Sequence, residues 1–246
     1  MTDKIIVNGM VLSATPVGDY DKRIVLLTKE RGKITAFAKG ARRPKSSLLA
    51  GTRPFVFGEF TVYEGKSAYN IISVEIRNFF DELVHDLEGA YYGFYFLELA
   101  DYYGRENVDA ADMLNLLYQS FRALIKPNID NQLIRRIFEL KIMTQNGEYP
   151  EMFECIVCHK KDNIFLYSML SSGCVCLNCI DKRAGIIKIS ESVRYTFQYV
   201  ISSDIAKLYT FVVTPDVMRE FSTIMDRHMR QYIDKEFKSL QLLKGI

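Results

Sequence analysis

The sequence lacks several features that would place it in a specialised class of protein. None of its 246 residues belong to a run that approaches the roughly 18 uninterrupted apolar residues of a membrane-spanning helix. The N-terminal segment MTDKIIVNGMVL has no apolar core followed by a small-residue cleavage site, so it does not resemble a secretory signal peptide. No internal repeat and no low-complexity tract is visible. We therefore expect a globular cytoplasmic protein with no membrane contact and with one large domain or two small ones.

The sequence also lacks the usual marks of an enzyme. No nucleophile stands at a suitable spacing from a general base, and no glycine-rich loop is present that would cradle a phosphate. Asp19, Asp21 and Lys22 lie close together, and paired carboxylates can hold Mg²⁺ for phosphodiester cleavage, so a metal-dependent nuclease is an alternative. A charged turn before a strand explains the same residues more simply. We expect no enzymatic activity.

Cysteine is absent from most of the chain, because all five cysteines lie between Cys155 and Cys179. This confinement excludes a disulfide framework spread over a secreted fold. Two C-x-x-C pairs, Cys155/Cys158 and Cys176/Cys179, are separated by 17 residues. Each C-x-x-C turn directs two thiolates at one point, and two such turns complete the tetrahedron that Zn²⁺ prefers. The sequence predicts a zinc knuckle over about residues 152–183, with a structural metal and no open coordination position.

The ligand set has alternatives. Cys174 or His159 could replace one of the four thiolates, and the cysteines could also be reduced and free of metal. A thioredoxin-like redox role is disfavoured, because neither pair follows a strand that opens a helix. The segment between the pairs is expected to be too short and polar to bury a core of its own, so the metal would supply on the order of 10 kcal/mol to the local fold.

Positive charge is concentrated near the N-terminus. Between Lys22 and Lys45 the chain carries nine Lys or Arg residues and one acid, Glu30, so this window has a net charge of +8. The whole chain carries +2, which leaves −6 on the remainder. A segment of this kind attracts polyanions, of which nucleic acid is the commonest. A solvated loop without a partner is the alternative for a charge run alone.

Residues 1 to about 77 have the pattern of five β-strands. Ile24–Leu27 and Ile34–Ala38 form a hairpin that leads into a basic loop at residues 39–45, and Gly58 in mid-strand predicts a bulge or a barrel corner. A five-stranded oligonucleotide-binding (OB) barrel is the common solution for so few short strands. Six aromatic residues could stack nucleobases, although each is more often a core residue: Phe37, Phe55, Phe57, Phe60, Tyr63 and Tyr69.

From residue 79 the hydrophobic period becomes helical. We expect a buried helix over Asp81–Arg105, then helices over Ala110–Ile125 and Asn131–Gln145, the three forming a bundle. After the knuckle we expect a helix over residues 190–201 and a long helix from Pro215, with His228 as a packed core residue. Asp130 and Thr214 are the expected N-caps of the third and the last helix. The predicted fold class is α+β: an OB domain at 1–78 and a helical domain with an embedded zinc-finger module at 79–246.

Taken together, these residues resemble the bacterial recombination mediator RecO family over nearly the whole chain. The matching motifs are Gly18-x-Tyr20-Asp21-x-Arg23-Ile24-Val25, Leu27-Thr28, Arg31-Gly32-Lys33, Ala38-Lys39-Gly40-Ala41-Arg42-Arg43-Pro44-Lys45-Ser46, Pro54-Phe55, Phe94-x-x-x-Leu97-Glu98-Leu99, Phe138-Glu139-Leu140, Gly147-x-x-Pro150, the C-x-x-C pairs and Lys238-Ser239. The basic run is the most specific of them. The family often has glycine where this chain has His159, and Gly-Gly where it has Ser172-Gly173.

The resemblance implies a DNA-binding recombination mediator in DNA repair. Such a protein binds single-stranded and double-stranded DNA, anneals complementary strands and, with RecR, helps to load RecA onto DNA coated by single-strand binding protein (SSB), whose C-terminal tail it also binds. The implied location is the nucleoid. The motif residues carried over for DNA are Lys39, Arg42, Arg43 and Lys45, with Arg23, Arg31 and Lys33 as second choices. A zinc-ribbon adaptor for RNA or protein remains the other alternative.

Overall fold

The computed structural model describes residues 4–126 and 128–243 and divides them into two compact units. The first unit contains the described residues up to Ile125 together with those from Phe237 onward, and the second unit runs from Lys126 to Glu236. No helix within the described ranges has the length and apolar character needed to cross a membrane.

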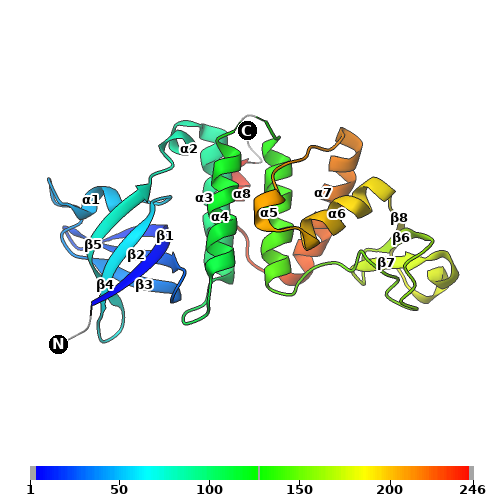
Figure 1. Ribbon diagram of the computed structural model, residues 1–246, viewed down its shortest axis with the longest axis horizontal. Coiled ribbons are helices and arrows are strands. Elements are labelled where there is room, and N and C mark those ends of the chain that lie inside the picture. Colours follow the sequence, from blue (N-terminus) through cyan, green and yellow to red (C-terminus); the bar gives the residue numbers. More distant parts are fainter. Residues whose placement is uncertain (1–3, 127, 244–246) are drawn as a thin grey trace. The chain divides into compact units, whose positions relative to one another are not determined.

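The first unit is built around a closed five-stranded barrel (Figure 1). Its strands, in chain order, are β1 (Lys4–Val17), β2 (Asp21–Thr28), β3 (Gly32–Ala38), β4 (Phe57–Glu64) and β5 (Tyr69–Asn78). The strand order is β1-β2-β3-β5-β4, with β4 pairing back to β1 and with a parallel contact between β3 and β5. The predicted OB-like barrel is therefore confirmed.

Alternating side chains fill the barrel. In β3 every second residue is buried, so that Ile34, Ala36 and Ala38 point inward while the residues between them are partly exposed. The pairing of β4 with β5 shifts register between Phe57 and Gly58, which confirms the predicted bulge. A Cβ at Gly58 would lie 2.3 Å from the carbonyl oxygen of Glu75, so only glycine allows the two strands to approach this closely.

The helices of the first unit are α1 (Leu48–Gly51), α2 (Asp81–His85), α3 (Leu87–Tyr103), α4 (Ala111–Leu124) and α8 (Lys238–Leu243). Helices α3 and α4 contact β1 and β2 on one side of the barrel, whereas α1 contacts β5 on the other side (Figure 1). The expected single helix over Asp81–Arg105 is wrong, because Asp86 has an extended backbone (ψ 110°) and separates α2 from α3. Asp favours helix termini over helix interiors, since its short carboxylate competes for backbone N–H groups. The expectation of a buried helix holds for α3, whose Tyr95, Phe96 and Leu99 are buried.

Phe55, which lies just before β4, connects the barrel to helices α3 and α4. The Phe55 ring packs against Phe94 of α3, with centroids 4.7 Å apart, and against Phe121 of α4, at 5.3 Å. Because α3 and α4 share this core with the barrel, residue 78 lies inside the first compact unit. The division into residues 1–78 and 79–246 stays a prediction.

The second unit combines three helices with a small sheet. Its elements are α5 (Asn131–Gln145), β6 (Ile164–Ser168), β7 (Gly173–Cys176), η1 (Leu177–Lys182), β8 (Ile186–Lys188), α6 (Glu191–Ser202), η2 (Ile205–Lys207) and α7 (Pro215–Tyr232). Side chains of Asp130, Ser190 and Thr214 accept backbone N–H groups at the starts of α5, α6 and α7, so the predicted caps Asp130 and Thr214 are confirmed. The expected three-helix bundle is wrong: α5 belongs to this unit, where it packs against α6 and α7.

Candidate nucleic-acid interface and metal centre

The basic loop that joins β3 to α1 is held in a defined conformation. The Asp21 carboxylate accepts the Gly40 backbone N–H at 2.7 Å, and the Tyr20 carbonyl accepts the Arg42 N–H at 2.8 Å. Gly40 has φ +65°, a left-handed value that glycine adopts without strain. Both contacts come from the start of β2 and the turn before it. The loop is thus fastened to the β1–β2 turn on its inner side.

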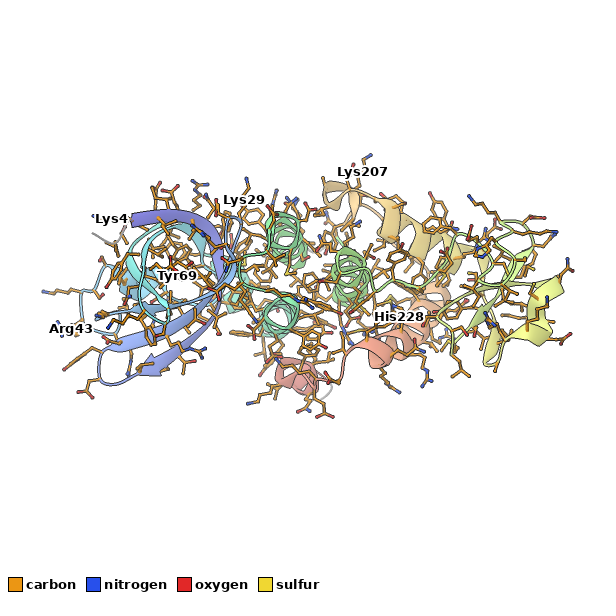
Figure 2. The ribbon with its side chains drawn as sticks, turned by 90° about the horizontal axis from the view of Figure 1, so that it is seen from below. Lys4, Lys29, Arg43, Tyr69, Lys207 and His228 are labelled. Carbon is orange, nitrogen blue, oxygen red and sulfur yellow. The ribbon has the colours of Figure 1, made fainter. Side chains whose placement is uncertain are left out.

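The four first-choice DNA residues lie together on this loop and are exposed: Lys39, Arg42, Arg43 and Lys45. Arg42 donates to the Gly18 carbonyl at 3.1 Å, and the Arg43 guanidinium carbon lies 5.1 Å from the Tyr20 ring centroid. Figure 2 shows Arg43 reaching outward at the outer end of the barrel. In the part of the chain that the structure describes, none of the four forms an ion pair with a carboxylate. Their charges therefore face solvent.

The second-choice residues do not join this cluster. Arg31 and Lys33 flank the β2–β3 turn, at the other end of the hairpin, beside Lys29, which Figure 2 shows far from Arg43. Lys33 donates to the Asp101 carbonyl at 2.6 Å and lies 3.3 Å from the Asp101 carboxylate. Arg23 is exposed on β2, paired in register with Phe37. The structure thus brings together the loop residues, leaves Arg23 on the barrel wall and commits Lys33 to the end of α3.

Three residues absent from the predicted site lie beside the loop: Tyr20, Lys22 and Arg53. The Lys22 ammonium group donates to the backbone oxygen and the hydroxyl of Thr52 at 3.2 and 3.0 Å. Burial lowers the pKa of Lys22, and the nearby positive charges of Arg53 and Arg42 lower this pKa further. Lys22 lies inside the basic window of the sequence and could have been included. Arg53 lies outside that window, and no local sequence pattern indicates that α1 brings it close to Lys22.

The aromatic candidates divide between core and rim. Phe55, Phe60 and Tyr69 are buried, whereas Phe37, Phe57 and Tyr63 are half-buried. Phe57 lies against Tyr118 of α4, with ring centroids 5.0 Å apart. Buried rings are unavailable to a nucleobase, so Phe55, Phe60 and Tyr69 are core residues, the more common role expected for each.

The four cysteines of the two pairs form one cluster in the second unit. Ligand atoms of Cys155, Cys158, Cys176 and Cys179 all lie within 4.8 Å of one another, and the Cys158 and Cys176 sulfurs are 3.6 Å apart. Four sulfurs around Zn²⁺ at about 2.3 Å would be about 3.8 Å apart in a regular tetrahedron. The donor type, number and spacing therefore fit a structural zinc ion.

Local backbone geometry positions these thiols. The first pair lies in a turn in which the His159 N–H bonds the Cys155 carbonyl at 2.9 Å, and the second pair spans the end of β7 and η1. Burial raises the pKa of Cys155, but backbone N–H groups of Cys176, Cys158 and Val157 outweigh it and bring that pKa to about 6. Burial raises the pKa of Cys179 to about 12. Cation binding would favour the thiolate at all four positions.

The two alternative ligands lie outside the cluster. The Cys174 sulfur packs 3.6 Å from the Met152 sulfur, and burial raises the Cys174 pKa to about 12. His159 is exposed, with Nδ1 2.5 Å from a Glu154 carboxylate oxygen.

The expectation that this segment buries no core is wrong, because a small apolar cluster is closed by strands β6–β8. Its buried members are Cys155, Leu166, Val175, Cys176 and Cys179.

Comparison with known proteins covers nearly the whole chain. A family model described as "Recombination protein O N terminal" matches residues 1–80, and one described as "Recombination protein O C terminal" matches residues 84–241. A relative from Acetivibrio thermocellus named "DNA repair protein RecO" is 31% identical over 97% of this chain and 96% of its own length. A relative of the same name from Alkaliphilus metalliredigens is 31% identical over 97% and 98%.

Proposed function

The chain belongs to the RecO family of DNA repair proteins, and from this premise we propose that it binds single-stranded and double-stranded DNA through the basic loop and anneals complementary strands. The observation that supports this proposal is the exposed loop itself. Lys39, Arg42, Arg43 and Lys45 stand at one end of the barrel without carboxylate partners among the described residues.

The mechanism requires charge neutralisation and no covalent chemistry. Two phosphate backbones repel each other as they approach, and a cationic surface reduces this repulsion and releases bound counterions. Bases that are left accessible can then pair. The fixed loop backbone presents the guanidinium groups of Arg42 and Arg43 in advance, so less conformational entropy is lost on binding.

The metal centre has a supporting role in this proposal. Zn²⁺ held by Cys155, Cys158, Cys176 and Cys179 would crosslink the turn to the β7–η1 segment. With four protein thiolates the metal would have no position for a substrate, so it would stabilise the fold of the second unit. We assign it no part in strand pairing.

The partners follow from family membership. We propose that the protein acts on nucleoid DNA together with RecR, binds the C-terminal tail of SSB, and so assists RecA in replacing SSB. A strand-annealing assay on SSB-coated DNA, with and without RecR and with Mg²⁺ present, tests this activity. Faster pairing of intact strands supports the mediator. Shortened strands would instead support the nuclease alternative, although Asp21 is already bonded to the Gly40 N–H.

A double substitution tests the loop directly. Arg42→Ala with Arg43→Ala should weaken binding to labelled single-stranded DNA and should flatten the log-log salt dependence by up to about 1.4, since each neutralised phosphate contributes about 0.7. Arg227→Ala with Arg230→Ala removes the same charge from exposed positions of α7 and is the matched control. Equal affinity and equal slope for the loop variant and the unmodified protein would refute the loop as the DNA contact.

A further inference from the structure

Tyr20 is an exposed aromatic residue at a site surrounded by positive charge. It lies in the turn between β1 and β2, and 49% of its surface is exposed although Arg43 lies over its ring. The adjoining carbonyl of Gly18 accepts Arg42, and the carbonyl of Tyr20 itself accepts the Arg42 N–H. The turn and the basic loop therefore hold each other in place, and the ring is presented by a fixed backbone.

A second group of cations lies beside this turn. Lys22 is fastened to Thr52, whose hydroxyl donates to the Leu48 carbonyl of α1 at 2.7 Å, and Arg53 follows Thr52 directly. Arg42 comes from the basic loop and donates to the Gly18 carbonyl, and the positive charges of Arg42 and Arg53 both act on Lys22. Three cations are thus gathered from β2, the loop and the end of α1.

In the described ranges these cations have no carboxylate within ion-pair distance, although the Asp21 carboxylate lies nearby and accepts the Gly40 N–H. Burial lowers the pKa of Lys22 most, and the two neighbouring positive charges also oppose its protonation. A bound phosphate oxygen would relieve this repulsion, so the arrangement favours an anionic ligand over an empty site.

We propose that Tyr20, Lys22, Arg42, Arg43 and Arg53, here called the Tyr20 corner, bind one nucleotide of single-stranded DNA. A backbone phosphate is held by Lys22, Arg42 and Arg53, and the adjoining base stacks on Tyr20. The inference rests on the proposed DNA binding and assigns to it residues outside the basic loop.

The two halves of the Tyr20 corner distinguish single strands from duplex. Phosphates are present in both forms, so the cations act on both. The faces of paired bases are covered by their neighbours in a duplex, whereas an unpaired base is free to stack on an aromatic ring. Tyr20 therefore contributes to single-strand binding alone, and it would hold an unpaired base apart until a complementary strand replaces the ring.

Fluorescence provides a direct test, because the chain contains no tryptophan. Tyr20→Trp introduces a single indole, whose emission should be quenched when an oligothymidylate binds. Tyr149→Trp places the indole at a site of similar exposure, 43%, in the second unit and should show no quenching. The stacking assignment would be overturned if both variants were quenched equally, or if neither variant were quenched. Stronger quenching of Tyr20→Trp by an RNA oligomer than by DNA would overturn the assignment to DNA.

Affinity measurements test each half of the Tyr20 corner. Tyr20→Leu should weaken single-strand binding roughly tenfold, the effect of losing one stacked base, and should leave duplex affinity unchanged. Arg53→Ala should weaken both and lower the single-strand salt slope by about 0.7, whereas Lys207→Ala, at an exposed position in the second unit (Figure 2), should change neither. If the unmodified protein binds DNA but Tyr20→Leu and Arg53→Ala bind equally well, the Tyr20 corner is refuted and the proposed function stands. If the unmodified protein binds no DNA, the proposed function itself fails.

Discussion

Two residues of the metal-binding segment at which the resemblance to the RecO family implies glycine have left-handed backbone angles. They are His159, with φ 60°, and Ser172, with φ 48°. In this chain each of these two non-glycine residues makes a side-chain contact. His159 contacts the Glu154 carboxylate, and the Ser172 hydroxyl lies 3.2 Å from Nδ1 of His228. Such contacts offset a backbone cost of about 1 kcal/mol.

The adjacent Gly173 has no room for a side chain, so its replacement should destabilise the metal module. A Cβ there would lie 2.3 Å from the Cγ2 methyl of Ile156, which follows the first metal-binding cysteine. Gly173→Ala should therefore cost about 1–3 kcal/mol of overpacking strain. We expect faster zinc release to a chelating dye and a lower unfolding temperature. Ser171→Ala, at an exposed position beside it, is the control. Unchanged zinc release would show that the module accommodates the methyl group.

At the scale of elements, features set by short-range chemistry were predictable from the sequence. The caps Asp130 and Thr214, the hairpin of β2 and β3, and the Gly58 bulge each depend on residues close in sequence. The paired spacing of the cysteines likewise identified the four clustered sulfurs.

Features that depend on contacts distant in sequence were not predictable. Lys33 was assigned to DNA, but its partner Asp101 lies in α3, and no local pattern links them. Arg53 and α1 were missed for the same reason, since a four-residue helix leaves almost no periodic pattern. The placement of α5 with α6 and α7 depended on which apolar faces meet, and periodicity does not specify this pairing.

Helix α7 should make the stability of the second unit sensitive to acid. Burial lowers the pKa of His228 below its ordinary value of 6.5, although contacts with Glu148 act in the opposite direction. As pH falls, the unfolded chain takes up this proton first. The contribution of neutral His228 to the free energy of unfolding is complete above the unfolded-state pKa of 6.5. This contribution is lost as the pH falls from there through the lower pKa of the folded state.

His228→Gln tests this dependence by removing the titrating ring. Between about pH 7.5 and pH 5.5 the unmodified protein should lose more unfolding free energy in denaturant titrations than the variant does. The comparison uses the change with pH, so a constant loss of stability in the variant does not affect it. Parallel pH profiles for the two proteins would show that His228 does not titrate in this range.

At the scale of the whole molecule, the two candidate sites belong to different compact units. The basic loop and the Tyr20 corner are in the first unit, whose barrel core, in the described part of the chain, is formed by residues between Ile5 and Ile76. The cysteine cluster is in the second unit. Because the barrel core draws on no residue of the metal module, we expect the proposed DNA binding to persist without the metal.

Zinc removal should therefore separate the two units experimentally. A strong chelator should unfold the metal module, since the four cysteines lose the ion that crosslinks them and the local core is small. Single-strand affinity, followed by anisotropy of labelled DNA, should stay within about twofold, and Tyr20→Trp quenching should persist, because the phosphate contacts that dominate affinity remain. Re-added Zn²⁺ should restore the unfolding transition of the second unit without changing DNA affinity. Loss of DNA binding in step with zinc release would instead place the nucleic-acid contact in the metal module and would favour a zinc-ribbon adaptor.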